Sequence, residues 1–205
     1  MDHQDFLIQP LEEQFLEAVV SVHQSVLGYS LNSRLGKEHL MLLYRTMSKS
    51  PDSFVAVALC DSRPIGFVSG TLNIESVKTL FVRSAPLTHW LAIAARLLIH
   101  PGLLLNWMRG SEIDKPVFLQ GAPVEPILTT IGIDEHFQGH GVGKKLICEL
   151  EDFFIRNKVS AYRLDTLKSN NNARQFYIAL GFLQITERAD SVIFVKSLDG
   201  KDKRI

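Results

Sequence analysis

Short apolar runs bounded by turn residues recur along this chain and predict a β-sheet. Several runs, such as SFVAVALC at 53–60, are rich in β-branched and aromatic residues, which favour strands. The tetrapeptide DSRP at 61–64 has the turn chemistry of a hairpin. The predicted strands cover residues 5–10, 53–60, 65–72, 127–133, 161–166, 182–186 and 192–197.

Helical periodicity fills most of the intervals between these strands. Apolar residues recur at i, i+3 and i+4 over 14–27, 36–47 and 141–157. With a shorter helix near 173–180, the order is β-α-α-β-β-β-α-β-α-β-β. This order predicts an α/β (α+β) domain with a mixed, mostly antiparallel central sheet flanked by helices. We expect residues 1–200 to form one domain, followed by a basic tail at 201–205.

The interval 74–112 does not fit that order and predicts a helical insertion before the fourth strand. Its segment 87–108 is strongly apolar, but Arg96 and the interruption at 100–102 exclude a membrane span, which needs about 20 apolar residues. Residues 103–108 would form a second short helix. The first helix would use one apolar face, made of Trp90, Ile93, Ala94, Leu97 and Leu98.

Three interpretations of this insertion stay open. It could be a helical pair that packs on the sheet, or the wall or lid of a substrate site. It could also present an apolar surface to a membrane, a lipid-linked substrate or a second subunit, which makes a homodimer reasonable.

Composition narrows the class of protein. The 205 residues are 46% hydrophobic and carry no formal net charge, so no broad cationic surface predicts a nucleic-acid partner. Cys60 and Cys148 have neither metal-binding spacing nor a disulfide pattern, and we interpret both as buried free thiols. The first residues do not resemble a secretory signal, so we expect a cytoplasmic enzyme.

The most informative motif is FQGHGVGKKL at 137–146, between a predicted strand and a predicted helix. Gly139, Gly141 and Gly143 let the backbone approach a ligand closely. The first N–H groups of a helix have no intrahelical partner, and the helix dipole adds positive charge there. The motif therefore predicts a site for a phosphorylated ligand, although a glycine trio alone could equally be an ordinary turn.

Two common phosphate-binding patterns do not fit this turn. A P-loop requires Ser or Thr after its lysine, and Lys145 is followed by leucine. A dinucleotide motif requires a third glycine where Lys144 stands. Its acidic residue would be Asp165, which lies inside a predicted strand.

A third pattern, Q/R-x-x-G-x-G/A, is satisfied by Gln138, Gly141 and Gly143. A second motif follows after one predicted helix and one strand, because 170–182 reads N-x-x-A-x-x-F-Y-x-x-x-G-F. Together they are similar to the motifs of the GNAT superfamily of acetyl-CoA-dependent N-acetyltransferases. The resemblance is strong over 124–196, whereas earlier only the order of elements is GNAT-like and the insertion is unexplained.

The second motif also has a purely structural interpretation. Ala173, Phe176, Tyr177 and Leu180 share one helical face, so periodicity alone favours a core tyrosine. Asn170 would then be only a helix N-cap. The resemblance implies instead that Tyr177 protonates the departing CoA thiolate and that Asn170 hydrogen-bonds the pantetheine or CoA arm.

The resemblance implies acetyl-CoA as cosubstrate, with no metal. The pantetheine would run along 131–133, where a backbone N–H near Ile133 could polarise the thioester carbonyl. The implied cofactor-binding residues are Ile131, Gly132, Ile133, Gln138, Gly139, His140, Gly141, Val142, Gly143, Lys144, Asn170 and Tyr177.

The general base is harder to assign. Glu125 lies near where many relatives place an acidic base, although a solvated loop carboxylate is an equal alternative. Asp134, Glu135 and His136 follow the strand on the cofactor side, and His136 or His140 could meet the phosphates or solvent. No Ser-His-Asp or Cys-His arrangement predicts a covalent intermediate, so we expect direct attack in a ternary complex.

The expected function is acetyl transfer to a primary amine of a small-molecule acceptor, such as an amino sugar, an amine or an amino acid. One alternative is a protein or peptide N-acetyltransferase, which would have an open groove. Another is a non-catalytic CoA-binding regulatory module, which gains support if Tyr177 points away from the sulfur.

Overall fold

A seven-stranded sheet runs through the part of the chain that the computed structural model describes, residues 5–100, 102–103 and 115–198. Its strand order is β1-β2-β3-β6-β7-β9-β8, and every neighbouring pair is antiparallel except β6 and β7. The strands are β1 (Leu7–Pro10), β2 (Ser53–Cys60), β3 (Arg63–Thr71), β6 (Ile127–Ile133), β7 (Ala161–Leu167), β8 (Leu183–Glu187) and β9 (Ser191–Ser197). The predicted mixed, mostly antiparallel sheet is thus confirmed.

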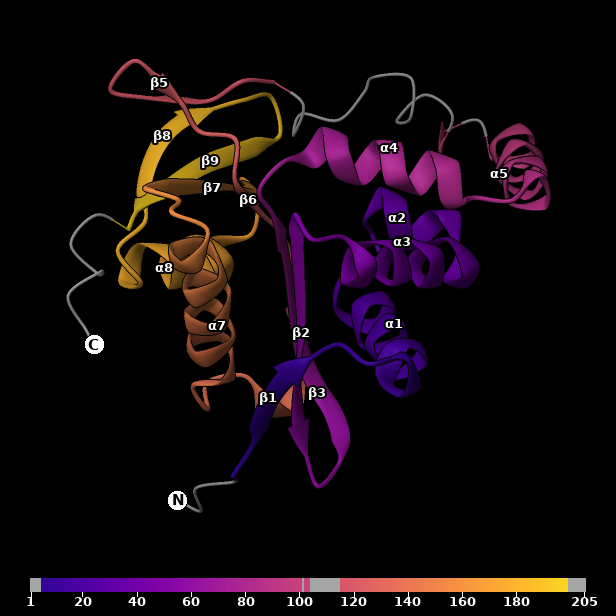
Figure 1. The fold of residues 1–205 in the computed structure, drawn as a ribbon, viewed down its shortest axis with the longest axis horizontal. Coiled ribbons are helices and arrows are strands. Elements are labelled where there is room, and N and C mark those ends of the chain that lie inside the picture. Colours follow the sequence, from indigo (N-terminus) through magenta and orange to yellow (C-terminus); the bar gives the residue numbers. More distant parts are fainter. Residues whose placement is uncertain (1–4, 101, 104–114, 199–205) are drawn as a thin grey trace.

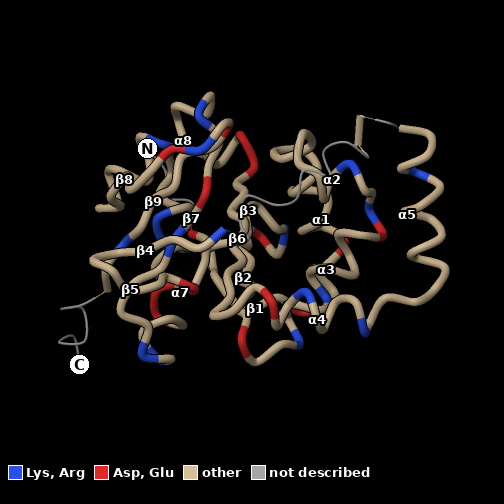
Figure 2. The backbone as a smooth tube through the Cα atoms, turned by 90° about the horizontal axis from the view of Figure 1, so that it is seen from above, with Lys and Arg blue, Asp and Glu red and all other residues tan. Residues whose placement is uncertain are grey.

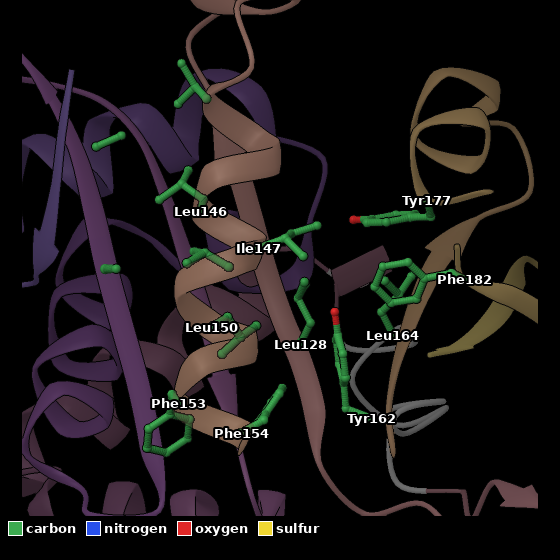
Figure 3. Packing of buried hydrophobic residues seen from close by; sticks show 14 of the residues in the cluster. Leu128, Leu146, Ile147, Leu150, Phe153, Phe154, Tyr162, Leu164, Tyr177 and Phe182 are labelled. Carbon is green, nitrogen blue, oxygen red and sulfur yellow. The ribbon is translucent and has the colours of Figure 1, made fainter. Parts of the chain in front are cut away.

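Helices cover both faces of the sheet (Figure 1). One face carries η1 (Glu13–Phe15), α1 (Leu16–Val26), α2 (Leu31–Leu35) and α3 (Lys37–Lys49), and the other carries α7 (Val142–Arg156) and α8 (Asn171–Ala179). On the first face, Val19, Leu40 and Phe67 are fully buried in one cluster. On the second face, α7 buries Leu146 and Phe154 among residues of β6, β7 and α8 (Figure 3).

The predicted strands agree with the structure to within two residues at each end. Asp61 and Ser62 form the turn between β2 and β3 with φ of 48° and 63°, as a two-residue hairpin with positive φ at both positions requires. Two features were not predicted from the sequence: α2, which has only five residues, and the small hairpin of β4 (Phe118–Leu119) and β5 (Ala122–Pro123).

The insertion differs from its prediction. It contains α4 (Ile74–Ser84), which was missed, and α5 (Leu87–Ile99), which buries Ile93 and Leu97 in a cluster with Leu35 of α2 and does not pack on the sheet. The predicted face was wrong in part, because Ala94 is exposed and Leu98 is 80% exposed. Most of the predicted second helix, 104–108, lies outside the described residues.

Figures 1 and 2 both place α5 at one end of the molecule, and its one Lys, Arg, Asp or Glu residue is Arg96. The helix is apolar around most of its circumference, so periodicity could not indicate which face packs. Among the described residues, no helix is both long enough and apolar enough to cross a membrane.

The two cysteines occupy different environments. Cys60 is buried at the end of β2, as predicted. Cys148 is exposed, so the prediction of a second buried thiol was wrong. Its position on α7 lies just outside the buried stripe that contains Leu146 and Ile147.

Candidate active site

The parallel pair at the centre of the sheet opens into a wedge. β6 and β7 pair at Ile127 and Arg163, and the Arg163 N–H donates to the Pro126 carbonyl oxygen at 2.9 Å. Beyond this point, no strand among the described residues pairs with the β7-facing edge of β6. The backbone of β6 therefore has an open edge beside β7.

A β-bulge marks the place where this edge opens. The register between β3 and β6 shifts between Ser69 and Gly70, so Thr129 is the extra residue of β6. The two hydroxyl oxygens of Thr129 and Ser69 lie 2.8 Å apart, and this hydrogen bond anchors the bulge. A bulge bends its strand and increases the local twist, which accounts for the end of pairing with β7.

Strand alternation decides which peptide groups face the wedge. The Asp134 N–H donates to the Ile65 carbonyl oxygen at 2.8 Å, on the β3 side. Successive peptide groups point to opposite sides, so those of Ile131 and Ile133 face the wedge and that of Gly132 faces β3. Gly132 has a packing role, since a Cβ there would come within 2.8 Å of Phe67.

The glycine turn lies at the mouth of this wedge, after η3 (Glu135–Phe137). Gly139 and Gly141 have φ of 79° and 82°, in the left-handed region that favours glycine, with open space on the side where a Cβ would project. The Gln138 amide donates to the Ile133 carbonyl oxygen at 3.2 Å and ties the turn to β6. The His140 Nδ1 lies 2.9 Å from the Gln138 carbonyl oxygen and so donates to it.

The first turn of α7 has free donors and an unusual charge. The helix ladder begins with the Lys145 N–H donating to the Gly141 carbonyl oxygen at 3.1 Å, so the N–H groups of 142–144 precede it. This turn contains Lys144 and Lys145 and no acidic residue, the reverse of what a helix dipole favours. A bound anion would compensate for both features, and a local rule broken in this way is typical of a functional site.

Close packing fixes α7 against the wedge. A Cβ on Gly143 would lie 3.0 Å from Ile133 of β6 and 3.0 Å from Phe176 of α8, so only glycine fits there without a shift. Val142 is buried, whereas Lys144 is exposed. The turn thus joins the end of β6, the start of α7 and the face of α8.

Tyr177 extends from α8 toward α7, and its hydroxyl oxygen points in that direction (Figure 3). Its side chain is 6% exposed, and its ring contacts Phe182 and Phe194. Burial raises the pKa of Tyr177, and the phenol of Tyr29, in the loop after α1, raises this pKa further. The phenol therefore stays protonated near neutral pH, as a general acid must.

The second motif begins with a helix cap. The Asn170 Oδ1 accepts the Ala173 N–H at 3.0 Å, so its side chain is the N-cap of α8. Since this bond uses only the carbonyl oxygen, the amide donors of Asn170 stay available to a ligand.

The candidate bases lie outside this assembly or are engaged elsewhere. Glu125 is exposed and precedes β6 at the end where β6 and β7 are paired. The Asp134 carboxylate accepts the His136 N–H at 3.1 Å and lies 3.6 Å from Arg63. Glu135 and His136 are exposed on η3. Thr129 and Tyr29 were not predicted from the sequence, where their one signal was a polar side chain in an apolar strand or loop.

The comparisons agree with this geometry. A model of the acetyltransferase (GNAT) family matches residues 105–182, which include both motifs. No curated protein sequence matches the chain significantly.

Similar solved structures cover nearly the whole chain. The PaiA N-acetyltransferase of Thermoplasma acidophilum, in complex with coenzyme A, has a TM-score of 0.62 at 14% identity, over 94% of this chain and 99% of that one. NAA60 of Arabidopsis thaliana, in complex with acetyl-CoA, has a TM-score of 0.60 at 16% identity, over 96% and 100%. An alanine N-acetyltransferase of a ribosomal protein from Escherichia coli has a TM-score of 0.58 at 16% identity, over 98% and 100%. At these identities the likeness shows the fold.

The wedge and the glycine turn therefore lie on a fold that solved N-acetyltransferases share. The match to the acetyltransferase (GNAT) family adds a likeness in sequence over residues 105–182, where both motifs lie.

Proposed function

We propose that this acetyltransferase moves the acetyl group of acetyl-CoA to a primary amine of a small molecule, by direct attack in a ternary complex. The observation that carries the proposal is the open edge of β6, which ends at a glycine turn with unpaired N–H groups. An extended pantetheine arm can add to that edge as a strand would. Its diphosphate then reaches the start of α7.

Each residue has a proposed role in this complex. The turn from Gln138 to Lys144 holds the diphosphate, and the Asn170 amide hydrogen-bonds the arm. The N–H groups of Ile131 and Ile133 bond the arm and polarise the thioester carbonyl, so they stabilise the tetrahedral oxyanion. The neutral amine attacks, the C–S bond breaks, and Tyr177 gives its proton to the thiolate. Our proposed base is Glu125, which takes the proton of the amine through water because it lies at the paired end of β6 and β7.

The environment of Tyr177 favours a small acceptor. The phenol of Tyr29, in the loop after α1, contributes to the raised pKa of Tyr177, which supports a position of this loop on the Tyr177 side of the wedge. The insertion contacts α2, the helix that follows this loop, because Arg96 Nη1 of α5 donates to the Leu35 carbonyl oxygen. The position of the Tyr29 loop and the hydrogen bond of Arg96 both support a narrow acceptor site.

A peptide acceptor is the second candidate. Among the similar structures, one is an alanine N-acetyltransferase of a ribosomal protein, and NAA60 is also solved with a bisubstrate analogue. A non-catalytic CoA-binding module is less well supported, because Tyr177 points toward α7 rather than outward (Figure 3). We also propose the cytoplasm as its location, since the two cysteines are unpaired.

Acceptor screening by thiol release tests this function. Acetyl-CoA is kept constant while amino sugars, amines, amino acids and short peptides with a free α-amine are compared. We expect small amines to be acetylated with kcat/KM at least about tenfold above any peptide, equivalent to about 1.4 kcal/mol of transition-state binding. Peptides as the better acceptors would contradict the proposal, and no thiol release despite acetyl-CoA binding would favour the regulatory module.

A further inference from the structure

A chain of buried polar side chains crosses the core on the α1 and α3 side of the sheet. His23 of α1 is 2% exposed, and its Nδ1 lies 2.5 Å from the hydroxyl oxygen of Tyr44 on α3. Tyr44 is fully buried, and Thr130 of β6 lies near enough to its phenol to lower the pKa, against the larger rise that burial causes. The other ring nitrogen of His23, Nε2, lies 3.3 Å from Ser30 Oγ. Four side chains therefore connect β6 to the loop after α1.

Each proton of this chain has a defined acceptor. Ser30 Oγ accepts the Ser33 N–H at 3.2 Å and donates to Ser33 Oγ at 3.1 Å, so it can accept one more bond. Burial lowers the pKa of His23 to about 4, so its ring is neutral near pH 7. With the proton on Nε2, the ring donates to Ser30 and its Nδ1 accepts from Tyr44, whose oxygen can still accept a hydrogen bond from the β6 side. With this single donor-to-acceptor direction, the hydrogen bonds of Ser30, His23 and Tyr44 are mutually compatible.

The two ends of this series of buried polar side chains, Thr130 and Ser30, lie beside parts of the proposed active site. Thr130 follows the bulge residue Thr129, where the edge of β6 opens. Ser30 is the N-cap of α2 and directly follows Tyr29, whose phenol affects Tyr177. The chain thus spans the distance between the thioester strand and the loop beside the general acid.

We propose that His23 and Tyr44 are positioning residues for acetyl transfer, and this rests on the proposed function. They are too deeply buried to touch either substrate. Their hydrogen bonds set where the loop with Tyr29 stands relative to β6, and so how the acceptor amine meets the thioester. A displacement of about 1 Å at such a site can lower the rate about 100-fold.

The first test replaces Tyr44 by Phe, which keeps the ring that packs on Phe67 and removes only the hydroxyl. We expect kcat/KM for the acceptor to fall at least about tenfold, while the Kd of acetyl-CoA changes less than about twofold. The matched control is Thr71→Val, which also removes a fully buried hydroxyl but at the far end of β3. Thr71→Val should keep the kcat/KM of the acceptor.

Three outcomes would overturn the proposal: unchanged acceptor kcat/KM in Tyr44→Phe, equal loss in Thr71→Val, or a parallel loss of acetyl-CoA affinity. The last would mean that the chain only supports the cofactor strand. Partial recovery in His23→Gln over His23→Leu is also expected, because glutamine has both a donor and an acceptor.

A second measurement does not depend on activity. Nitrogen-15 NMR of the imidazole should show His23 protonated at Nε2 and neutral at pH 7, and protonation at Nδ1 would contradict the direction of the chain. If the wild-type protein shows this tautomer but does not bind acetyl-CoA, the proposed function fails while the hydrogen-bonded chain stands.

Discussion

At the scale of single residues, the candidate site depends on the directions of backbone N–H and C=O groups and on glycines that have no Cβ. Ile131 and Ile133 turn their peptide groups toward the wedge, Gly141 has open space where a Cβ would project, and a Cβ on Gly143 would crowd Ile133 and Phe176. Tyr177 is the one predicted catalytic side chain that lies inside the assembly. Its buried phenol has a raised pKa, so it can be a proton donor over the working pH range.

Tyr177→Phe tests that assignment. The variant keeps the ring contacts with Phe182 and Phe194 but cannot protonate the thiolate. We expect kcat to fall at least about tenfold, since general acid catalysis typically contributes 10²–10⁴-fold, with little change in the Kd of acetyl-CoA. Steady-state kinetics and calorimetry measure the two quantities. An unchanged kcat would remove Tyr177 from the chemistry.

Some residue-scale features could be predicted from the sequence and others could not. The glycine spacing indicated the turn, because positive φ and free N–H groups follow from local chemistry. The role of Gly132 did not follow, since it depends on Phe67 of another strand. His23 stands on an apolar helical face, which was the one available signal of a buried polar chain. Its partners Tyr44 and Thr130 are distant in sequence, so the pattern could not join them.

At the scale of elements, the two parts of α7 have different roles. Its first turn faces the wedge, and the rest of the helix packs on the sheet through an apolar stripe (Figure 3). A buried ion pair joins it to β9, because Lys196 Nζ lies 2.6 Å from Glu151 Oε1. The Tyr162 hydroxyl donates to the same carboxylate at 2.8 Å. This contact fixes α7 relative to the strands beyond the wedge.

Lys196→Met should therefore destabilise the fold. Removing the ammonium takes the Lys196 cation away from the buried Glu151 carboxylate, and we expect the free energy of unfolding to fall by about 3 kcal/mol. Glu151→Leu together with Lys196→Met should recover most of this loss, because an apolar pair of similar size requires no charge burial. Urea unfolding measures both variants. A single variant as stable as the wild type would show that the ion pair does not stabilise α7.

The strands were predictable because short runs of β-branched residues between turn residues rarely form any other secondary structure. The bulge at Thr129 was not, since ILTTIGI at 127–133 has the composition of an ordinary strand and only the register with β3 reveals the extra residue. The face that α5 packs was not predictable either. Nearly every side of that helix is apolar, and its contact with Leu35 depends on α2, which is too short to show a period.

At the scale of the whole molecule, two segments of the chain contribute to the surroundings of the wedge, one before β6 and one after it. The segment before β6 supplies α1, α2 and the loop with Tyr29, whereas the segment after β6 supplies the glycine turn, α8 and Tyr177 (Figure 1). The family match at 105–182 falls mostly in the second half, where the motifs lie. This agrees with the resemblance to GNAT motifs, which is strong over 124–196 and limited to the order of elements in the earlier part of the chain.

The molecule should lose stability in mild acid. Burial lowers the pKa of His23 to about 4, and burial together with the neighbouring His89 lowers the pKa of His39 to about 4. Between that value and the ordinary pKa of about 6.5, the unfolded chain binds more protons than the folded protein. The free energy of unfolding should therefore rise as pH increases from about 4 to about 6.5, by up to about 1.4 kcal/mol per pH unit for each histidine.

Urea unfolding between pH 4.5 and 7.5 measures this dependence. His23→Gln should reduce the slope, because one titrating group is removed while a neutral hydrogen-bonding side chain remains. A free energy of unfolding that is independent of pH over this interval would show that neither histidine is held neutral by burial.

Isothermal titration of acetyl-CoA with matched glycine variants tests most directly whether the backbone of 138–144 binds the diphosphate of the coenzyme. Gly141 and Gly121 both have positive φ with open space beside them, so replacing either by Asp adds the same strain and charge. We predict that Gly121→Asp, in the β4–β5 turn, binds acetyl-CoA like the wild type, while Gly141→Asp loses at least about 100-fold in affinity, or about 2.7 kcal/mol. Wild-type affinity in a folded Gly141→Asp protein would contradict the assignment, as would a wild-type protein that does not bind the coenzyme.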